Sequence, residues 1–436
     1  MARKETNVFV SVSKHFIDAL STKEKYRLSK TDFIRNRKLP FEHLVLCMLK
    51  LLRKSLQAEI YSFFREVGTS VKSVTASAFV QSRKKIKPDL FYDLNHIITN
   101  EFYTDNDENV KLYKGMRVLS VDGSTINLPF NKELIAEYGF FNNQKKTNDV
   151  VIGRVSVLYD VLNEIVIDGL LRPFSQGEVT LSREHFKYAE KGDLIIMDRA
   201  YPNFESAYIL GNQEVDFLFR CKKSFSNQVR AFYESGKQDE TIQIKAKQNK
   251  SFKDLPYSQH STITVRMLRV KLDSGEVEIL MTSLLDSREF PLEEFKELYF
   301  KRWKVETYYN RFKNIIGVEH FSGTSHQFIQ QEFNCALYMS NMQTILTQDA
   351  ENEAIEKYKN RRYEYKINQS LSLGLIREKL IQMFTNKEDE EKLLEELKQL
   401  FVANVVPIRP GRSNKRDVDK HRQRTKPKQF KNRRII

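Results

Sequence analysis

The chain has 436 residues, enough for about three average domains or one large domain with additions. Hydrophobic residues make up 40% of it and charged residues 30%, which is typical of a globular protein with a buried core and excludes a wholly disordered chain. Seventy-two Lys and Arg oppose 57 Asp and Glu, and the net charge of +15 favours a polyanionic partner, either nucleic acid or an anionic membrane surface.

A membrane role is disfavoured by the hydropathy pattern. No segment approaches the ~20 consecutive apolar residues that a membrane-spanning helix needs, and the first residues lack the apolar core of a signal peptide. The three cysteines, Cys47, Cys221 and Cys335, have neither metal-binding spacing nor a disulfide pattern. We expect buried thiols in a reducing, cytoplasmic environment without membrane association.

Residues 1–110 are predicted to be helical. In the run 41–64, apolar residues recur at helical spacing, and Pro40 suits the first turn of that helix. Residues 73–94 fit a short helix–turn–helix unit with four basic residues just before Pro88. Basic helices of this kind suit phosphate contacts or a recognition helix in a DNA groove, although many ordinary helical domains are basic too. We therefore interpret 1–110 as a helical DNA-binding region.

Strands are predicted from residue 116 onward. The runs 117–128, 149–161 and 163–171 are rich in β-branched residues and separated by turn residues. Helices predicted at 182–190 and 203–210 each lead to an apolar strand, at 193–198 and 216–221 respectively. This order predicts an α/β fold, in which helices cover a mixed sheet.

The rest of the chain divides into three parts. Residues 222–286 contain alternating strand patterns and are predicted to be an all-β insertion with one solvated face. Helix then resumes at Pro291 and continues with breaks to about residue 400. The predicted organisation is a helical region at 1–110, an α/β core at 111–221 and 287–345, a β-rich insertion at 222–286, a helical C-terminal region at 346–405 and a basic tail at 406–436.

The C-terminal tail carries much of the net charge. Residues 409–434 contain twelve Lys or Arg, against which stand only Asp417 and Asp419. The tail is poor in apolar residues, so we expect it to be extended until it meets a polyanion. A purely solubilising role fits this charge equally well.

Two aspartates, Asp122 and Asp198, are predicted at the ends of apolar strands. Strand ends in an open α/β sheet are where side chains can leave the core and face a ligand. Either aspartate alone could simply close a strand or begin a turn.

The predicted helix after Pro291 adds a third acid. At ~100° per residue, Tyr299, Arg302, Glu306 and Lys313 fall on one narrow stripe beside the apolar face. A salt-bridged surface helix would explain one such stripe. An acid held between an Arg and a Lys also suits a metal ion and phosphates together.

Three carboxylates brought together would repel one another unless a divalent cation neutralised them. Oxygen ligands without His or Cys select a hard ion, so Mg²⁺ is expected and Mn²⁺ could replace it. Two such ions, roughly 3.5–4 Å apart, can activate water or a 3′-hydroxyl and stabilise the leaving oxygen. The chemistry therefore favours phosphodiester cleavage or strand transfer on nucleic acid.

These residues resemble a known family. Tyr299, Arg302, Glu306 and Lys313 reproduce the Y-(2)-R-(3)-E-(6)-K signature of bacterial DDE transposases of insertion-sequence family four. DGST at Asp122 and DRAY at Asp198 are similar to that family's first two catalytic motifs. The resemblance covers about 116–323, and it implies a ribonuclease-H-like core interrupted by a β-rich insertion.

The resemblance also implies roles. Asp122, Asp198 and Glu306 would bind two Mg²⁺ ions, while Tyr299, Arg302 and Lys313 would hold DNA phosphates. The enzyme would bind the terminal inverted repeats of its element as a synaptic homodimer, in the bacterial nucleoid. It would excise the element from double-stranded DNA and join it to target DNA. Some relatives form a hairpin and stack a flipped base on a Trp of the insertion. The single Trp of this sequence, Trp303, lies instead in the helix predicted to carry Glu306, so Phe225, Phe252 or Tyr257 would have to serve, or the mechanism differs.

Two other functions fit the same residues. A two-metal DNA nuclease without strand transfer could use the same triad. A transposase-derived protein could also bind DNA without catalysis, although all three acids and the full signature are intact.

Overall fold

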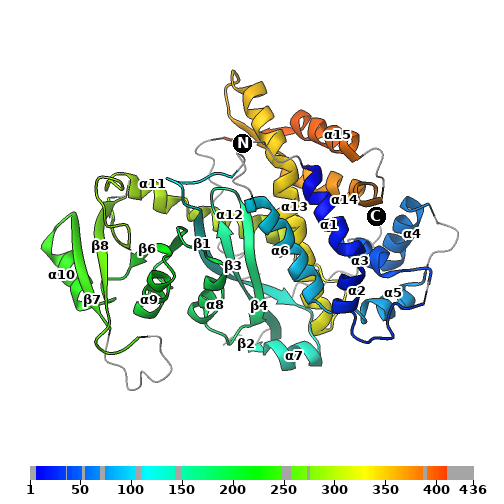
Figure 1. Cartoon of the computed structure of the whole chain (residues 1–436), viewed down its shortest axis with the longest axis horizontal. Helices are drawn as coiled ribbons and strands as arrows, with labels where there is room; N and C mark the ends of the chain where they lie inside the picture. The colour runs from blue at the N-terminus through cyan, green and yellow to red at the C-terminus, as the bar shows by residue number, and fades with distance from the viewer. Residues whose placement is uncertain are drawn as a thin grey trace.

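The computed structural model describes residues 6–35, 37–51, 55–68, 74–104, 110–142, 149–246, 257–272, 275–385 and 390–409. Most of the predicted basic tail and Phe252 lie outside these ranges. Along its longest axis (Figure 1), the N-terminal helices lie at one end, the insertion at the other, and the main sheet between them.

The central part of the sheet has the ribonuclease-H-like order. Three antiparallel strands are followed by two parallel ones in the spatial order β4-β3-β1-β5-β6. Their bounds are β1 Val118–Leu128, β3 Asp149–Asp160, β4 Ile165–Pro173, β5 Leu194–Met197 and β6 Asp216–Cys221. A short strand, β2 (Phe141–Asn142), pairs with β3. The predicted α/β class with a mixed sheet is confirmed.

Helices cover both faces of this sheet, which explains why β5 is a continuous apolar run. All four residues of β5 are buried, as expected for a parallel strand covered on both sides. On one face lie α8 Glu178–Glu184, a 3₁₀ turn Phe186–Tyr188 and α9 Phe204–Asn212. Another connecting helix, α7 Lys132–Tyr138, packs on the opposite face, where its Leu134 and Tyr138 join the buried cluster that includes α13. The predicted helix at 182–190 thus begins earlier, at Glu178, and ends at Glu184.

The insertion extends the main sheet. It contains α10 (Asn227–Ser235), β7 (Asp239–Lys245), β8 (Thr262–Lys271) and β9 (Val277–Thr282). Because β9 pairs antiparallel with β6, the order continues β6-β9-β8-β7. The expectation of an all-β insertion was wrong, since Ser226 caps α10 and its Val229 and Phe232 are buried.

The N-terminal region is helical, as predicted, but its long helix is divided. Its helices are α1 Asn7–Asp18, α2 Leu20–Tyr26, α3 Phe41–Leu49, α4 Leu56–Glu66, α5 Ala76–Arg83 and α6 Asp89–Tyr103. The predicted helix at 41–64 is two helices, because Leu51 follows α3 with a φ of 50° in the left-handed region. The helix–turn–helix unit corresponds to α5 and α6.

The C-terminal half is also mainly helical. It comprises α11 Glu294–Phe300, α12 Trp303–Arg311, a π turn Phe312–Ile316, α13 His326–Tyr358, α14 Gln369–Thr385 and α15 Glu390–Ala403. The 33 residues of α13 run across the predicted boundary at 345, so that boundary falls inside one helix. Two short paired strands, β10 Tyr365–Ile367 and β11 Val405–Pro407, were not predicted. None of the described helices is both long and apolar enough to cross a membrane.

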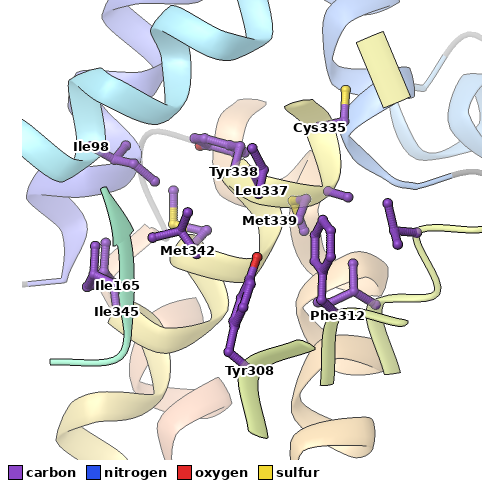
Figure 2. Packing of buried hydrophobic residues seen from close by; sticks show 14 of the residues in the cluster. Ile98, Ile165, Tyr308, Phe312, Cys335, Leu337, Tyr338, Met339, Met342 and Ile345 are labelled. Atoms are coloured by element: carbon purple, nitrogen blue, oxygen red, sulfur yellow. The ribbon is translucent and has the colours of Figure 1, made fainter. Parts of the chain in front are cut away.

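The largest buried cluster joins the N-terminal helices, one face of the sheet and α11–α15. Figure 2 shows its centre, where Tyr308 and Phe312 point toward α13, with Ile98 of α6 and Ile165 of β4 beside that helix. The Tyr308 and Phe312 rings stack with centroids 5.4 Å apart. A second cluster lies on the other face of the sheet, under α9 and α10. The three cysteines are free and buried, as predicted.

A buried polar network ties α6 to the sheet. His185 bonds Asp168 of β4 through Nδ1 at 2.6 Å and Ser156 of β3 through Nε2 at 2.9 Å. Tyr92 of α6 donates to the other Asp168 oxygen at 2.7 Å. Burial opposes ionisation of Asp168, but hydrogen bonds from His185, His96 and Tyr92 hold its pKa well below the usual range. The network therefore fixes the helical region against β4 with an ionised, fully bonded carboxylate.

Replacing Phe312 by Ala should lower the free energy of unfolding by about 3–5 kcal/mol, because the substitution opens a cavity in the largest core cluster. Phe300, whose side chain is 67% exposed, is the matched control, and Phe300→Ala should change stability by at most about 0.5 kcal/mol. Urea denaturation of both variants measures the difference. Equal losses would contradict the packing described for Phe312.

Candidate active site

The two predicted catalytic aspartates lie at neighbouring positions on the sheet. In the parallel pairing of β1 with β5, Ser120 stands opposite Ile196. Asp122 and Asp198 each come two residues later in their chains, so both lie where the pairing of β1 with β5 ends. Asp198 follows the end of β5, as predicted. Asp122 instead lies inside the long strand β1, because residues 119–128 also pair with β3.

The third acid, Glu306, belongs to α12, which packs against β1. The Tyr309 hydroxyl of α12 donates to the main-chain oxygen of Asp122 at 2.8 Å, which fixes the helix against the strand at this point. The helix predicted from Pro291 as one piece is divided into α11 and α12. Around residues 301–302 the main chain makes hydrogen bonds to the third residue back, as in a 3₁₀ turn. One of them runs from the Arg302 N–H to the Tyr299 main-chain oxygen at 3.1 Å.

Despite this break, the signature residues contact Asp198, one another and β1. The Tyr299 hydroxyl donates to Asp198 Oδ1 at 3.3 Å. Arg302 Nη2 donates to Glu306 Oε1 at 2.9 Å. Lys313, in the π turn, donates to the Ser124 hydroxyl of β1 at 2.7 Å.

The electrostatics place three negative charges in one neighbourhood. Burial, together with the charges of Glu306 and Asp198, raises the pKa of Asp122 to about 6 from its usual 3.8. The Gly123 N–H, which donates to Asp122 Oδ1 at 2.9 Å, and the charge of Arg302 oppose this rise. Asp122 is therefore a buried carboxylate near two others, and a bound divalent cation would relieve their repulsion.

The carboxylates are not assembled as a ligand cage. Among the residues that the structure describes, no group of three or more His, Cys, Asp and Glu lies close enough together to hold a metal ion. Glu306 is instead paired with Arg302, whose side chain is only 6% exposed. The oxygen-only donor set nevertheless fits Mg²⁺ or Mn²⁺ in its chemistry.

Sequence reasoning missed three side chains of this site. They are Tyr309, described above, Tyr201, whose hydroxyl lies 3.4 Å from Asp122 Oδ1, and Arg220, whose Nη1 lies 3.6 Å from Asp198 Oδ1. Arg220 also binds Glu278 of β9 at 2.7 Å, so the insertion is connected to the site. Tyr201 belongs to the DRAY motif and Tyr309 to the signature segment, so both motifs contained a signal. The sequence around Arg220 contains no such signal. Its place in the site follows from the pairing of β6 with β5, the strand that ends just before Asp198.

Two of the aromatic residues considered for base stacking lie together. Phe225 and Tyr257 line one groove of about 480 Å³, between α9 and the insertion. The Tyr257 ring packs edge-on against Phe204 at 5.0 Å. This contact is also what ordinary packing would give, so stacking of a flipped base stays a prediction.

Comparison with known families decides the broad identity. A family model described as the transposase DDE domain matches residues 113–342, which is more than half of the chain. The chain belongs to the DDE transposase family. The matched range contains Asp122, Asp198, Glu306 and the rest of the signature. The narrower assignment to insertion-sequence family four stays a prediction.

Two further comparisons add little. No curated protein matches the transposase sequence. Among solved structures, a cryo-EM structure of a piggyBac transposase synaptic complex with hairpin DNA matches at 10% sequence identity and a TM-score of 0.39, covering 96% of this chain and 87% of that chain. A similarity this weak carries no argument about mechanism.

The raised pKa of Asp122 gives a test in metal-free buffer. The folded transposase binds a proton at Asp122 more tightly than the unfolded chain does, so stability falls as the pH rises from about 4 through 6. Asp122→Asn removes this loss and should raise the free energy of unfolding at pH 7 by about 1–3 kcal/mol, with little gain at pH 4. Urea denaturation in the presence of a chelator measures both values.

Asp286 provides the matched control, because hydrogen bonds from the Arg288 and Glu289 N–H groups lower its pKa instead. Asp286→Asn should give no gain at pH 7. A gain for Asp122→Asn that is equal at both pH values would contradict the assigned charge effect.

Proposed function

We propose that this transposase is a cut-and-paste enzyme of insertion-sequence family four that cleaves double-stranded DNA and transfers the cut strands. The observation that carries the proposal is the convergence of Asp122, Asp198 and Glu306 from β1, the end of β5 and α12 into one negatively charged neighbourhood. These three carboxylates would hold two Mg²⁺ ions, or Mn²⁺ in their place. When bound, the ions activate water or a 3′-hydroxyl and stabilise the leaving oxygen.

The cationic residues have a role in each state of the site. Without metal, Arg302 offsets the charge of Glu306 at 2.9 Å. A divalent cation would replace Arg302 as the partner of Glu306, and the guanidinium would then be available to a DNA phosphate. The Arg302 Nε has no hydrogen-bond partner within the described part of the chain, so this residue has donor capacity to spare. Tyr299 and Lys313 would hold neighbouring phosphates.

The substrate in this proposal is a pair of DNA ends. The net charge of +15 favours a polyanion. The helical region 1–110 would bind the terminal inverted repeats, and a homodimer would hold two ends together in the bacterial nucleoid. Target DNA would accept the freed 3′-hydroxyls.

Glu306→Gln should slow Mg²⁺-dependent cleavage of an inverted-repeat duplex by more than about 100-fold. Loss of a residue that only contacts a metal ligand typically lowers activity by about 10–100-fold, and loss of a ligand itself should lower it more. Binding of the uncleaved duplex should remain. Glu297→Gln is the control, since Glu297 makes the analogous i,i+4 pair with Lys301 at 3.1 Å but is 81% exposed. Gel analysis of the products measures both, and normal cleavage by Glu306→Gln would remove this residue from the triad.

Strand transfer separates the proposal from a two-metal nuclease. A pre-cut end with a free 3′-hydroxyl, incubated with the protein, Mg²⁺ and a supercoiled plasmid, should become covalently joined to the plasmid. Asp198→Asn should abolish the joined product. Cleavage of uncut ends without any joining of pre-cut ends would favour the nuclease, and end binding without either reaction would favour a non-catalytic DNA-binding protein.

A further inference from the structure

The helix that carries Glu306 also borders a groove, and most of the groove lining on that helix lies away from Glu306. The groove, of about 810 Å³, runs between α12, the C-terminal part of α13 and β10. On α12 it is lined by Lys304, Thr307, Tyr308, Asn310 and Arg311. At 100° per residue, four of these lie between about 100° and 160° from Glu306 around the helix, and Asn310 lies about 40° from it. In Figure 1, this end of α13 projects beyond the main sheet, beside α15.

The groove is basic and aromatic. Its six cations are Lys304, Arg311, Lys359, Arg361, Arg362 and Lys366, against the three acids Glu164, Glu351 and Glu364. Much of this charge comes from the segment 358–366, which joins α13 to β10 and contains four cations interspersed with three tyrosines. Basic side chains interleaved with aromatic rings are typical of surfaces that follow a nucleic-acid backbone.

The cations of the groove differ in their pairing. Arg311 is fixed by Ser340 and Thr344 at 3.0 and 3.1 Å. Lys304 pairs with Glu164 at 3.2 Å, and Lys359 pairs with Glu356. The rim cations, Arg361, Arg362 and Lys366, are exposed and have no acidic partner among the residues described. Their charge is therefore available to a ligand.

The rim arginines are also held in place. The Arg361 guanidinium lies 4.7 Å from the ring centre of Tyr358 and 5.5 Å from that of Tyr365. Arg362 lies 5.2 Å from the ring of Tyr363. Stacking on a ring leaves the N–H groups in the guanidinium plane free to bond phosphate oxygens, and it reduces the entropy lost on binding.

The basic tail begins next to this surface. The Ile408 N–H donates to the Glu364 oxygen at 2.7 Å, and Ile408 lines the groove. The next residue, Arg409, begins the segment 409–434 with its twelve basic residues. The tail therefore starts at the groove.

We infer that this groove binds the sugar–phosphate backbone of a second DNA duplex, distinct from the one at the catalytic site and without regard to its sequence. The inference rests on the proposed function, which requires each subunit to contact end DNA and target DNA at once. Because most of the α12 residues that line the groove lie on the side of the helix away from Glu306, a duplex held there is not the one positioned for cutting at that site.

The test compares the triple variant R361A/R362A/K366A with the natural full-length chain. Affinities for an inverted-repeat duplex and for a random duplex are measured over a range of salt concentrations. Loss of three phosphate contacts should reduce the slope of log K against log salt by about 2.7, equally for both duplexes. An unchanged slope overturns the inference.

Two controls separate charge from folding and position. R361K/R362K keeps the charge and should keep the natural slope, and Lys392→Ala removes an exposed cation of α15 outside the groove lining, with no expected effect. The single-turnover cleavage rate with saturating end DNA should not change in the triple variant, while joining to target DNA should decline. If the natural chain cleaves nothing, the proposed function fails, yet the salt slopes still decide whether the groove binds DNA.

Discussion

The parallel pairing of β1 with β5 is the constraint on which the candidate site depends. The pairing ends at Ser120 and Ile196, and the next positions bring the carboxylates of Asp122 and Asp198 to one place on the sheet. Two acids held by backbone hydrogen bonds cannot move apart to relieve their repulsion. The surrounding structure must therefore compensate for their charge.

The compensation comes from elements that are distant in sequence. Tyr299 and Arg220 approach Asp198 from α11 and β6, and Arg302 pairs with Glu306 from the start of α12. Burial and the neighbouring carboxylates still leave Asp122 with a raised pKa. A raised carboxylate pKa reduces stability at neutral pH, and perturbed groups of this kind are concentrated at functional sites.

The same sheet joins the site to both ends of the molecule. On one side, β9 continues the sheet from β6, and the ion pair of Arg220 with Glu278 connects the insertion to Asp198. On the other side, the network of His185, Asp168 and Tyr92 connects α6 to β4. The N-terminal helices and α13 share one buried core with this sheet.

The sequence by itself determined the α/β class, the strand positions and the family, because alternating β-branched runs and the spacing of Tyr299, Arg302, Glu306 and Lys313 are local patterns. It did not determine the break between α11 and α12, the helix α10 or the paired strands β10 and β11, since these depend on packing partners far along the chain. Only the tertiary structure decided that Glu306 pairs with Arg302, that Arg220 lies beside Asp198, and that a basic groove borders α12. Side-chain pairing of this kind depends on strand order and helix docking, and neither is encoded in the spacing of any single segment.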